Sequence, residues 1–308
     1  MITTFERTAT WEGIGSNVSN ATTVEEILKS SDLDYTVEKR PMFIDVPGTE
    51  DKILVPDKCA TVRTDTNDIL GVVSKKYEIC QNQEAFDFID SVSSETNLTF
   101  QKAGMTHNGL IYIIAKLPEI TVLGDSFSPN LIFQTSHNGF FTLKTTICPL
   151  RIVCQNQFAY SFEKSPNTVS IQHSSQYAAK LKQAEELLRS TMTYMTNFTN
   201  TAEELALLKV GNDDNIKEII NSFFKSAEEI TERQNALIEQ KSNMLFNSYN
   251  AEDNQNFKGT AWGLLNGFTD FVTHSSGKKT PNEDTKFLQV TFNPLIIQNF
   301  VNHIKSFA

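Results

Sequence analysis

The sequence predicts an α+β protein: an antiparallel β-meander with flanking helices, followed by a mainly helical C-terminal part. Two Asn-Gly pairs, at Asn108 and Asn138, each join two apolar runs of strand length. Asn-Gly favours a tight hairpin turn because both central residues need positive φ. After about residue 173 the apolar spacing changes to three and four residues, which is typical of amphipathic helices. We therefore expect a mixed α+β core over residues 1–173 and a helical part over residues 174–308.

The first 80 residues predict one short helix and several short strands. Thr23 and Glu26 have the spacing of a capping box, which predicts a helix through about Ser31. Short β-branched runs follow, and they are broken at Pro41 and Pro56. The expected strands cover residues 35–39, 42–46, 53–55, 61–63 and 69–73.

A second helix is expected from Asn82 to about Val92, because its apolar residues recur on one face. The meander follows, with an apolar strand at 110–115 and another strand at 140–147 after the turn at 137–139. The stretch after Pro149 fits either a strand end or a helix start, and its periodicity does not decide between them.

The C-terminal part predicts five helices. One long amphipathic helix is expected from about Ser174 to Phe198. A capping box at Thr201 predicts the start of the next helix, and Asn212 is expected to cap a stretch that extends to about Phe246. Further apolar faces predict helices over 259–272 and 294–305, with a loop at 275–281.

The composition is that of a folded protein. It includes 39% hydrophobic residues, 21% charged residues and 22 phenylalanines, and so many rings need a core or an interface to cover them. No run reaches the roughly 18 apolar residues of a membrane span, and the N-terminus has no signal-peptide pattern. We expect a cytoplasmic protein with no membrane partner. Its four cysteines form no CxxC pair and are expected to be reduced.

The charge is unevenly distributed. The formal net charge is −10, which argues against a chain wrapped over its whole surface by nucleic acid. Residues 1–95 carry a net charge of −9, residues 96–193 of +3 and residues 194–308 of −4. A positive middle segment is what a focused polyanion site would show, although an ordinary surface can have the same excess.

Motifs for common enzyme classes are missing from the sequence. It contains no HExxH or paired CxxC pattern for a metal, no phosphate-binding P-loop and no GxSxG nucleophile turn. His107 and His137 stand beside the Asn-Gly turns, where an exposed polar residue is expected in any case. We therefore expect no catalytic residues, no metal and no cofactor. Whether the protein is an enzyme stays uncertain, and the sequence favours a non-enzyme.

The middle segment combines cations with aromatic rings. Single-stranded nucleic acid is bound by cations that neutralise phosphates and by rings that stack on bases. Ordinary solvated surface remains the alternative for each cation, and core packing for most of the rings. The expected nucleic-acid contacts are Lys102, Lys116, Phe141, Lys144 and Arg151.

Several short motifs resemble one family. They include residues 11–15 (WEGIG), 62–66 (VRTDT), 136–139 (SHNG), 151–156 (RIVCQN) and 259–263 (GTAWG). These motifs, in this order over most of the chain, resemble the phage/plasmid-like proteins that are described as a domain of unknown function. The resemblance implies a gene of a mobile element, such as a phage, and brings no catalytic residues.

The order of elements suggests a second, fold-level likeness. A helix, three or four antiparallel strands and a long helix are similar to the core of single-strand annealing recombinases such as RecT, phage Red beta and the eukaryotic Rad fifty-two type. That likeness implies rings or filaments that hold single-stranded DNA in a basic groove against a β-hairpin. It is an analogy, because a shared fold does not establish a shared function.

Two functional hypotheses follow. The first is a phage-type protein that binds and anneals single-stranded DNA without ATP, as a homo-oligomer in a ring or filament. The alternative is a non-catalytic phage protein that binds and modulates a host protein, which the acidic N-terminal third favours.

Overall fold

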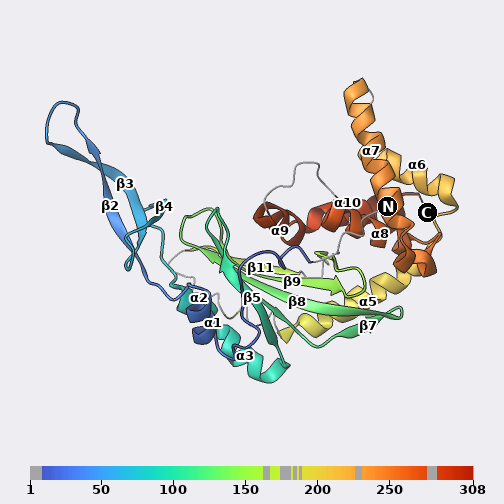
Figure 1. Ribbon diagram of the computed structural model, residues 1–308, viewed down its shortest axis with the longest axis horizontal. Helices are drawn as coiled ribbons and strands as arrows, with labels where there is room; N and C mark the ends of the chain where they lie inside the picture. The colour runs from blue at the N-terminus through green and yellow to red at the C-terminus, as the bar shows by residue number, and fades with distance from the viewer. Residues whose placement is uncertain are drawn as a thin grey trace.

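The computed structural model describes residues 9–161, 167–173, 182, 186, 189–225, 231–275 and 283–307. It contains two antiparallel sheets with helices around the larger one, which confirms the α+β class. Figure 1 shows the small sheet projecting from one end of the molecule as an arm, while most of the C-terminal helices gather at the opposite end. The expected helix start at Ser174 lies outside the described residues.

The larger sheet is the predicted meander with additions. Its strand order is β1-β5-β6-β8-β9-β10, while β7 pairs with β8 and β11 pairs with β9. Ile113 lies opposite Phe133, and Phe133 lies opposite Thr145, so the register runs straight across the three central strands. The strands are β1 (Ser16–Asn17), β5 (Thr99–Met105), β6 (Leu110–Lys116), β7 (Ile120–Val122), β8 (Asp125–Ser136), β9 (Leu143–Arg151), β10 (Asn156–Gln157) and β11 (Thr168–Ile171).

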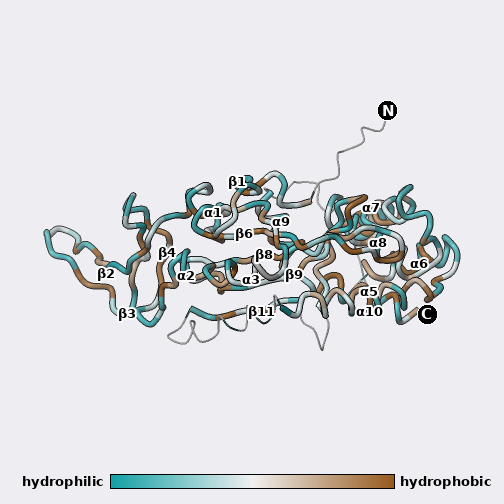
Figure 2. The backbone as a smooth tube through the Cα atoms, turned by 90° about the horizontal axis from the view of Figure 1, so that it is seen from below, coloured by the Kyte–Doolittle hydropathy of each residue, from teal (hydrophilic) through white to brown (hydrophobic). Residues whose placement is uncertain are grey.

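The sheet buries both of its faces. Ile111 and Ile113 belong to the main core cluster, whereas Tyr112 and Ile114 belong to a second cluster with Trp11. This follows from the alternation of side chains along a strand. Figure 2 shows the central strands between α9 (Glu283–Thr291) on one side and α5 (Thr191–Leu207) and α10 (Pro294–Lys305) on the other.

Three short helices close the N-terminal end of the main core. The predicted cap is confirmed, because the Thr23 side chain accepts from the Glu26 amide at the start of α1 (Val24–Ser30). The helix expected from Asn82 is two helices, α2 (Asn82–Phe86) and α3 (Phe88–Thr96). Their buried residues join the main core cluster.

The C-terminal helices differ from the expectation at Thr201 and after Phe224. α5 runs unbroken through Thr201, so the capping-box pattern there starts no new helix; the neighbouring Ala202 and Leu205 are buried and keep the chain packed against the core. Asn212 caps α6 as predicted, but that helix ends at Phe224 and Thr231 caps a separate helix. These helices are α6 (Asp213–Phe224), α7 (Glu232–Tyr249), the 3-10 helix η1 (Glu252–Phe257), α8 (Ala261–Asp270) and the π-helix η2 (Phe271–Ser275).

The arm consists of β2 (Val37–Asp45), β3 (Lys52–Arg63) and β4 (Ile69–Ser74), in the order β2-β3-β4. Prolines were expected to interrupt these strands, and they do not. Pro41 lies on the edge strand β2, and Pro56 lies in the part of β3 that extends beyond its pairing with β4. A proline is tolerated at such positions because its missing N–H is not needed by a neighbouring strand.

The segment after Pro149 continues β9 to Arg151, turns, and returns as the short strand β10. Phe158 then stacks on Trp262 of α8, with ring centroids 5.7 Å apart. This contact joins the sheet to the C-terminal helices. In the part of the chain that the structure describes, no helix is both long and apolar enough to cross a membrane.

Candidate nucleic-acid interface

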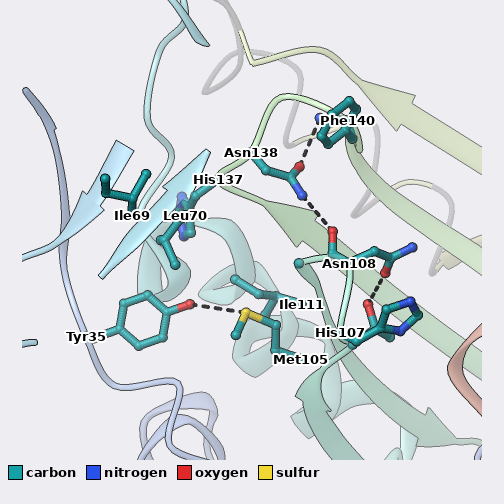
Figure 3. Close-up of a pocket in the computed structure, with 12 residues that line it drawn as sticks. Tyr35, Ile69, Leu70, Met105, His107, Asn108, Ile111, His137, Asn138 and Phe140 are labelled. Atoms are coloured by element: carbon teal, nitrogen blue, oxygen red, sulfur yellow. Dashed lines mark hydrogen bonds between the residues drawn. The ribbon is translucent and has the colours of Figure 1, made fainter. Parts of the chain in front are cut away.

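A groove of about 550 Å³ lies where the arm meets the larger sheet. We call it the turn groove, because both Asn-Gly turns border it (Figure 3). Its volume falls in the range typical of small-molecule sites. The lining residues are Tyr35, Ile69, Leu70, Met105, Thr106, His107, Asn108, Gly109, Ile111, His137, Asn138 and Phe140.

Asn138 connects the two turns. Its side-chain Nδ2 donates to the Asn108 carbonyl at 2.7 Å, and its Oδ1 accepts from the Phe140 amide at 2.9 Å, as Figure 3 shows. Gly109 is at φ +82°, and a Cβ there would lie 2.6 Å from Asn138 Nδ2. Glycine is therefore required both for the turn conformation and for the close approach of the two turns.

The arm is fastened to the second turn by buried hydrogen bonds. Thr61 Oγ1 of β3 donates to the His137 carbonyl at 2.6 Å, and the Tyr77 hydroxyl donates to the Ser136 carbonyl at 2.9 Å. Gly71 of β4 lies so close that a Cβ there would be 2.5 Å from Asn138 Cα. The groove is thus held between two sheets that are fixed to each other.

His137 is a neutral structural residue of this groove. Asn82 Nδ2 donates to the Leu33 carbonyl, so Asn82 Oδ1 is left to accept from His137 Nε2 at 2.9 Å. Burial, with a smaller contribution from His173, lowers the pKa of His137 to about 4. No group of three or more potential metal ligands is found among the described residues.

Two groups at the groove match the chemistry of a single-stranded nucleic acid. The Phe140 side chain is 84% exposed, as is rare for a large aromatic residue. Arg63 lies over the ring of Tyr35, with Cζ 3.9 Å from the centroid. An exposed ring can stack on a base, and an arginine can bind a phosphate through two hydrogen bonds.

Arg63 is paired with two carboxylates that water reaches. Its NH2 lies 2.8 Å from Asp65 Oδ2, and its NH1 lies 3.9 Å from Asp32 Oδ2. The hydrogen bond from Arg63 lowers the pKa of Asp65 to about 2. The Asp65 and Asp32 side chains are 48% and 93% exposed, whereas the Arg63 side chain is 12% exposed. Ion pairs with exposed carboxylates are weak enough for a phosphate that reaches Arg63 to replace them.

The lysines expected from the sequence share one face of the larger sheet. Lys102 lies opposite Ile114, which is two residues from Lys116, so the two lysines point to the same side. Lys144 lies opposite Gln134, and Gln134 lies opposite Tyr112 of the strand that carries Lys116, so Lys144 points to that side as well. From strand spacing, Lys144 is roughly 17 Å from Lys116. The structure therefore brings Lys102 and Lys116 together and leaves Lys144 apart.

None of the three lysines is fully exposed. Lys102 Nζ donates to the Glu12 carbonyl at 3.0 Å, beneath the N-terminal segment. Lys144 Nζ lies 5.4 Å from the centroid of Phe292, and burial lowers the pKa of Lys144. Phe141 is half-buried against the second core cluster. These side chains face the covered side of the sheet, away from the turn groove.

Arg151 must be removed from the expected DNA contacts. Its side chain is 1% exposed; NH2 lies 2.7 Å from Asp125 Oδ2, and NH1 lies 3.0 Å from Asp253 Oδ2. NH2 also donates to the Asp253 carbonyl at 2.7 Å. Arg151 therefore joins the end of the sheet to η1, and a phosphate has no access to it.

The groove includes residues that the sequence did not single out. The Asn-Gly turns were predicted as turns, but nothing in the sequence places Tyr35 and Arg63 beside them. The one available signal was Phe140, a large aromatic residue directly after a tight turn, where a hairpin exposes its side chains.

A comparison with family models finds one match. The family described as a domain of unknown function (DUF932) matches residues 69–290, which include β4, the whole meander and the helices from α5 to α8. Comparison with curated proteins and with solved structures gave no match.

Proposed function

Since the chain belongs to the DUF932 family, a family without an assigned activity, we propose its function from its own geometry. It is a phage-type protein of the host cytoplasm that binds single-stranded DNA and anneals it without ATP, as a homo-oligomer. DNA binds in the turn groove.

The observation that carries this proposal is the exposed ring of Phe140 at the rim of an open groove, with Arg63 and Tyr35 on the arm side. Base–aromatic stacking contributes about 1–3 kcal/mol per base and tolerates any sequence. A ring that is free to stack selects unpaired bases, since bases in a duplex already stack on each other.

The overall architecture gives weaker support. A helix pair, an antiparallel meander and a long helix occur in the order of the single-strand annealing recombinases, and a β-hairpin stands beside the groove. One groove holds only a short stretch of DNA. Several copies in a ring or filament would hold a longer strand extended, so that a complementary strand can pair with it.

The test is binding of a fluorescent single-stranded oligonucleotide of about forty nucleotides at low and at physiological salt, because phosphate contacts weaken steeply with salt. Annealing is followed with two labelled complementary strands in the absence of ATP. We expect Phe140→Ala and Arg63→Ala each to weaken binding about tenfold.

Matched controls are Phe307→Ala and Arg233→Ala. Phe307 is 44% exposed at the C-terminus, and Arg233 is exposed at the start of α7. α7 and the end of α10 lie at the end of the molecule opposite the arm (Figure 1), so both variants should bind as the unaltered chain does. Absence of binding at low salt, or equal losses in the controls, would refute the proposal.

A second candidate function rests on the surface of α1 to α3. This region carries Glu25, Glu26, Glu84, Asp87 and Asp90, with Lys29 as its one cation. Such a surface is complementary to a basic protein surface. If no DNA binds, purification of host partners with the unaltered chain and with Glu25→Lys/Glu84→Lys tests this candidate.

A further inference from the structure

The Asn108 side chain presents a hydrogen-bond donor at the rim of the turn groove. Its Oδ1 accepts from the Thr106 hydroxyl at 2.6 Å, and the backbone carbonyl of Asn108 is taken by Asn138 Nδ2. Asn108 is exposed, and its Nδ2 has no hydrogen-bond partner among the described residues. Figure 3 shows Nδ2 pointing away from the bond to Thr106. This side chain therefore offers a ligand two N–H donors, while its acceptor is already used.

The first turn determines which way this amide faces. Thr106 Oγ1 accepts from the Leu110 amide at 3.1 Å, so the proton of the Thr106 hydroxyl is left to donate. The 2.6 Å separation between Thr106 Oγ1 and Asn108 Oδ1 is that of an O–H···O bond, whereas an amide nitrogen would lie at about 2.9 Å. Oδ1 therefore faces Thr106, and Nδ2 is the atom left for a ligand.

Asn108 and Phe140 are held within the width of one base. The Asn138 amide donates to the Asn108 carbonyl and accepts from the Phe140 amide. Because the oxygen and nitrogen of one amide are close together, the Asn108 carbonyl oxygen and the Phe140 backbone nitrogen are at most about 8 Å apart. Both side chains line the turn groove. A base that stacks on the Phe140 ring can therefore extend its hydrogen-bonding edge to Asn108.

The donor of Asn108 distinguishes two classes of base. An asparagine that offers both a donor and an acceptor pairs with adenine through two hydrogen bonds. Asn108 lacks the acceptor, because Thr106 uses its Oδ1. Thymine and guanine carry a carbonyl oxygen where cytosine and adenine carry an amino group. A carbonyl oxygen accepts from Nδ2, whereas an amino group would set two donors against each other.

The neighbouring polar side chains of the groove do not supply the missing acceptor. Asn138 Oδ1 already accepts from the Phe140 amide. Tyr35 and His137 are 6% and 2% exposed, so their polar atoms lie below the surface of the groove. His107 is exposed, but a neutral imidazole donates or accepts according to its tautomer and so favours neither class of base.

We propose that the turn groove prefers keto bases, thymine and guanine, over amino bases, adenine and cytosine. Phe140 stacks on the base, and Asn108 Nδ2 donates to its carbonyl oxygen. The inference rests on the proposed binding of single-stranded DNA, and it adds a base preference that stacking alone does not provide.

The first experiment compares oligonucleotides that are matched in ring size. Single strands of about forty deoxyuridines and deoxycytidines differ in the keto or amino group of a pyrimidine, and strands of deoxyinosine and deoxyadenosine differ in the same way in a purine. We expect the keto strand of each pair to bind about threefold to tenfold more tightly, as one added hydrogen bond allows. Equal binding within both pairs overturns the inference and leaves the proposed function in place. Absence of binding by all four strands refutes the proposed function and the inference with it.

The second experiment exchanges the donor for an acceptor. Asn108→Asp keeps the bond from Thr106 and the preference for a turn before Gly109, but presents an oxygen in place of Nδ2. The added negative charge weakens the binding of every strand, so the readout is the ratio of keto to amino affinity. We expect this ratio to fall below one.

Asn302→Asp is the matched control, because Asn302 is exposed on α10 and that substitution adds the same charge outside the turn groove. Its ratio of keto to amino affinity should equal that of the unaltered chain. An unchanged ratio in Asn108→Asp, or an equal change in both variants, overturns the inference.

Discussion

Arg63 and Arg151 are each paired with two aspartates, yet the two sites have opposite properties. The Arg63 side chain is 12% exposed and its partners Asp65 and Asp32 are 48% and 93% exposed, whereas the Arg151 side chain is 1% exposed and its partners Asp125 and Asp253 are 24% and 17% exposed. A buried charge needs its partners, because burial removes the water that would otherwise solvate it. An exposed pair can exchange partners at little cost. The charge of a residue in the sequence therefore says less about ligand binding than its solvent access does.

The strongest way to test this comparison is to remove each arginine. Arg151→Ala leaves two carboxylates without their cation and should lower the free energy of unfolding by about 3–5 kcal/mol. Arg63→Ala should lower it by at most about 1 kcal/mol. Urea denaturation followed by circular dichroism measures both. Equal losses in the two variants would show that burial does not distinguish the sites.

A change of pH tests whether His137, which lines the groove, is buried in its neutral form. An unfolded histidine binds a proton near pH 6.5, whereas folded His137 binds one only near pH 4. Stability should therefore be complete above about pH 6.5 and fall as the pH drops toward 4, by at most about 3 kcal/mol for this residue. Burial lowers the pKa of His173 to about 4 as well, so His137→Gln should remove only part of the acid loss. An unchanged pH dependence in that variant would contradict the assignment.

The contact between arm and turn can be broken sterically. A Cβ on Gly71 would lie 2.5 Å from Asn138 Cα, so Gly71→Val should cost about 1–3 kcal/mol and weaken DNA binding. Val72→Ala is the neighbouring control, because Val72 is 50% exposed. Thermal unfolding and oligonucleotide binding would be measured on both. A fully stable Gly71→Val protein would mean that the two sheets are not fixed to each other.

The smallest expected effect concerns the exposed pair itself. Asp65→Asn removes the carboxylate that competes with a phosphate for Arg63 and should tighten oligonucleotide binding by about threefold at low salt. Stability should change little, because Asp65 is a surface residue. Weaker binding in this variant would indicate that Asp65 orients Arg63 rather than competing with the DNA.

Local signals predicted the elements well, and long-range contacts explain what they missed. The caps at Thr23 and Asn212 and the last helix follow from chemistry within a few residues. The Asn-Gly pairs do mark turns, but only Gly109 and Gly139 have positive φ and the second connection spans residues 137–142, so the predicted two-residue turn with two positive φ angles was wrong. Thr201 fits the same capping rule, but tertiary packing carries α5 through it.

The candidate site was harder to predict for the same reason. Arg151 looked like a surface cation because one of its partners, Asp253, is 102 residues away. Phe140 and Tyr35, which has Arg63 over its ring, line one groove only because β4 packs against the second turn. No pattern within a short window of sequence contains that information.

The single side chain of Asn138, which hydrogen-bonds to both turns, also has a consequence for folding. A one-residue slip of β8 would move the Asn138 amide away from the Asn108 carbonyl of the first turn. This hydrogen bond therefore stabilises the pairing of one hairpin only when the other hairpin is also in register. The two hairpins should therefore form in one cooperative step. In native-state hydrogen exchange, the amides of β6 and β9 should open together, with one free energy.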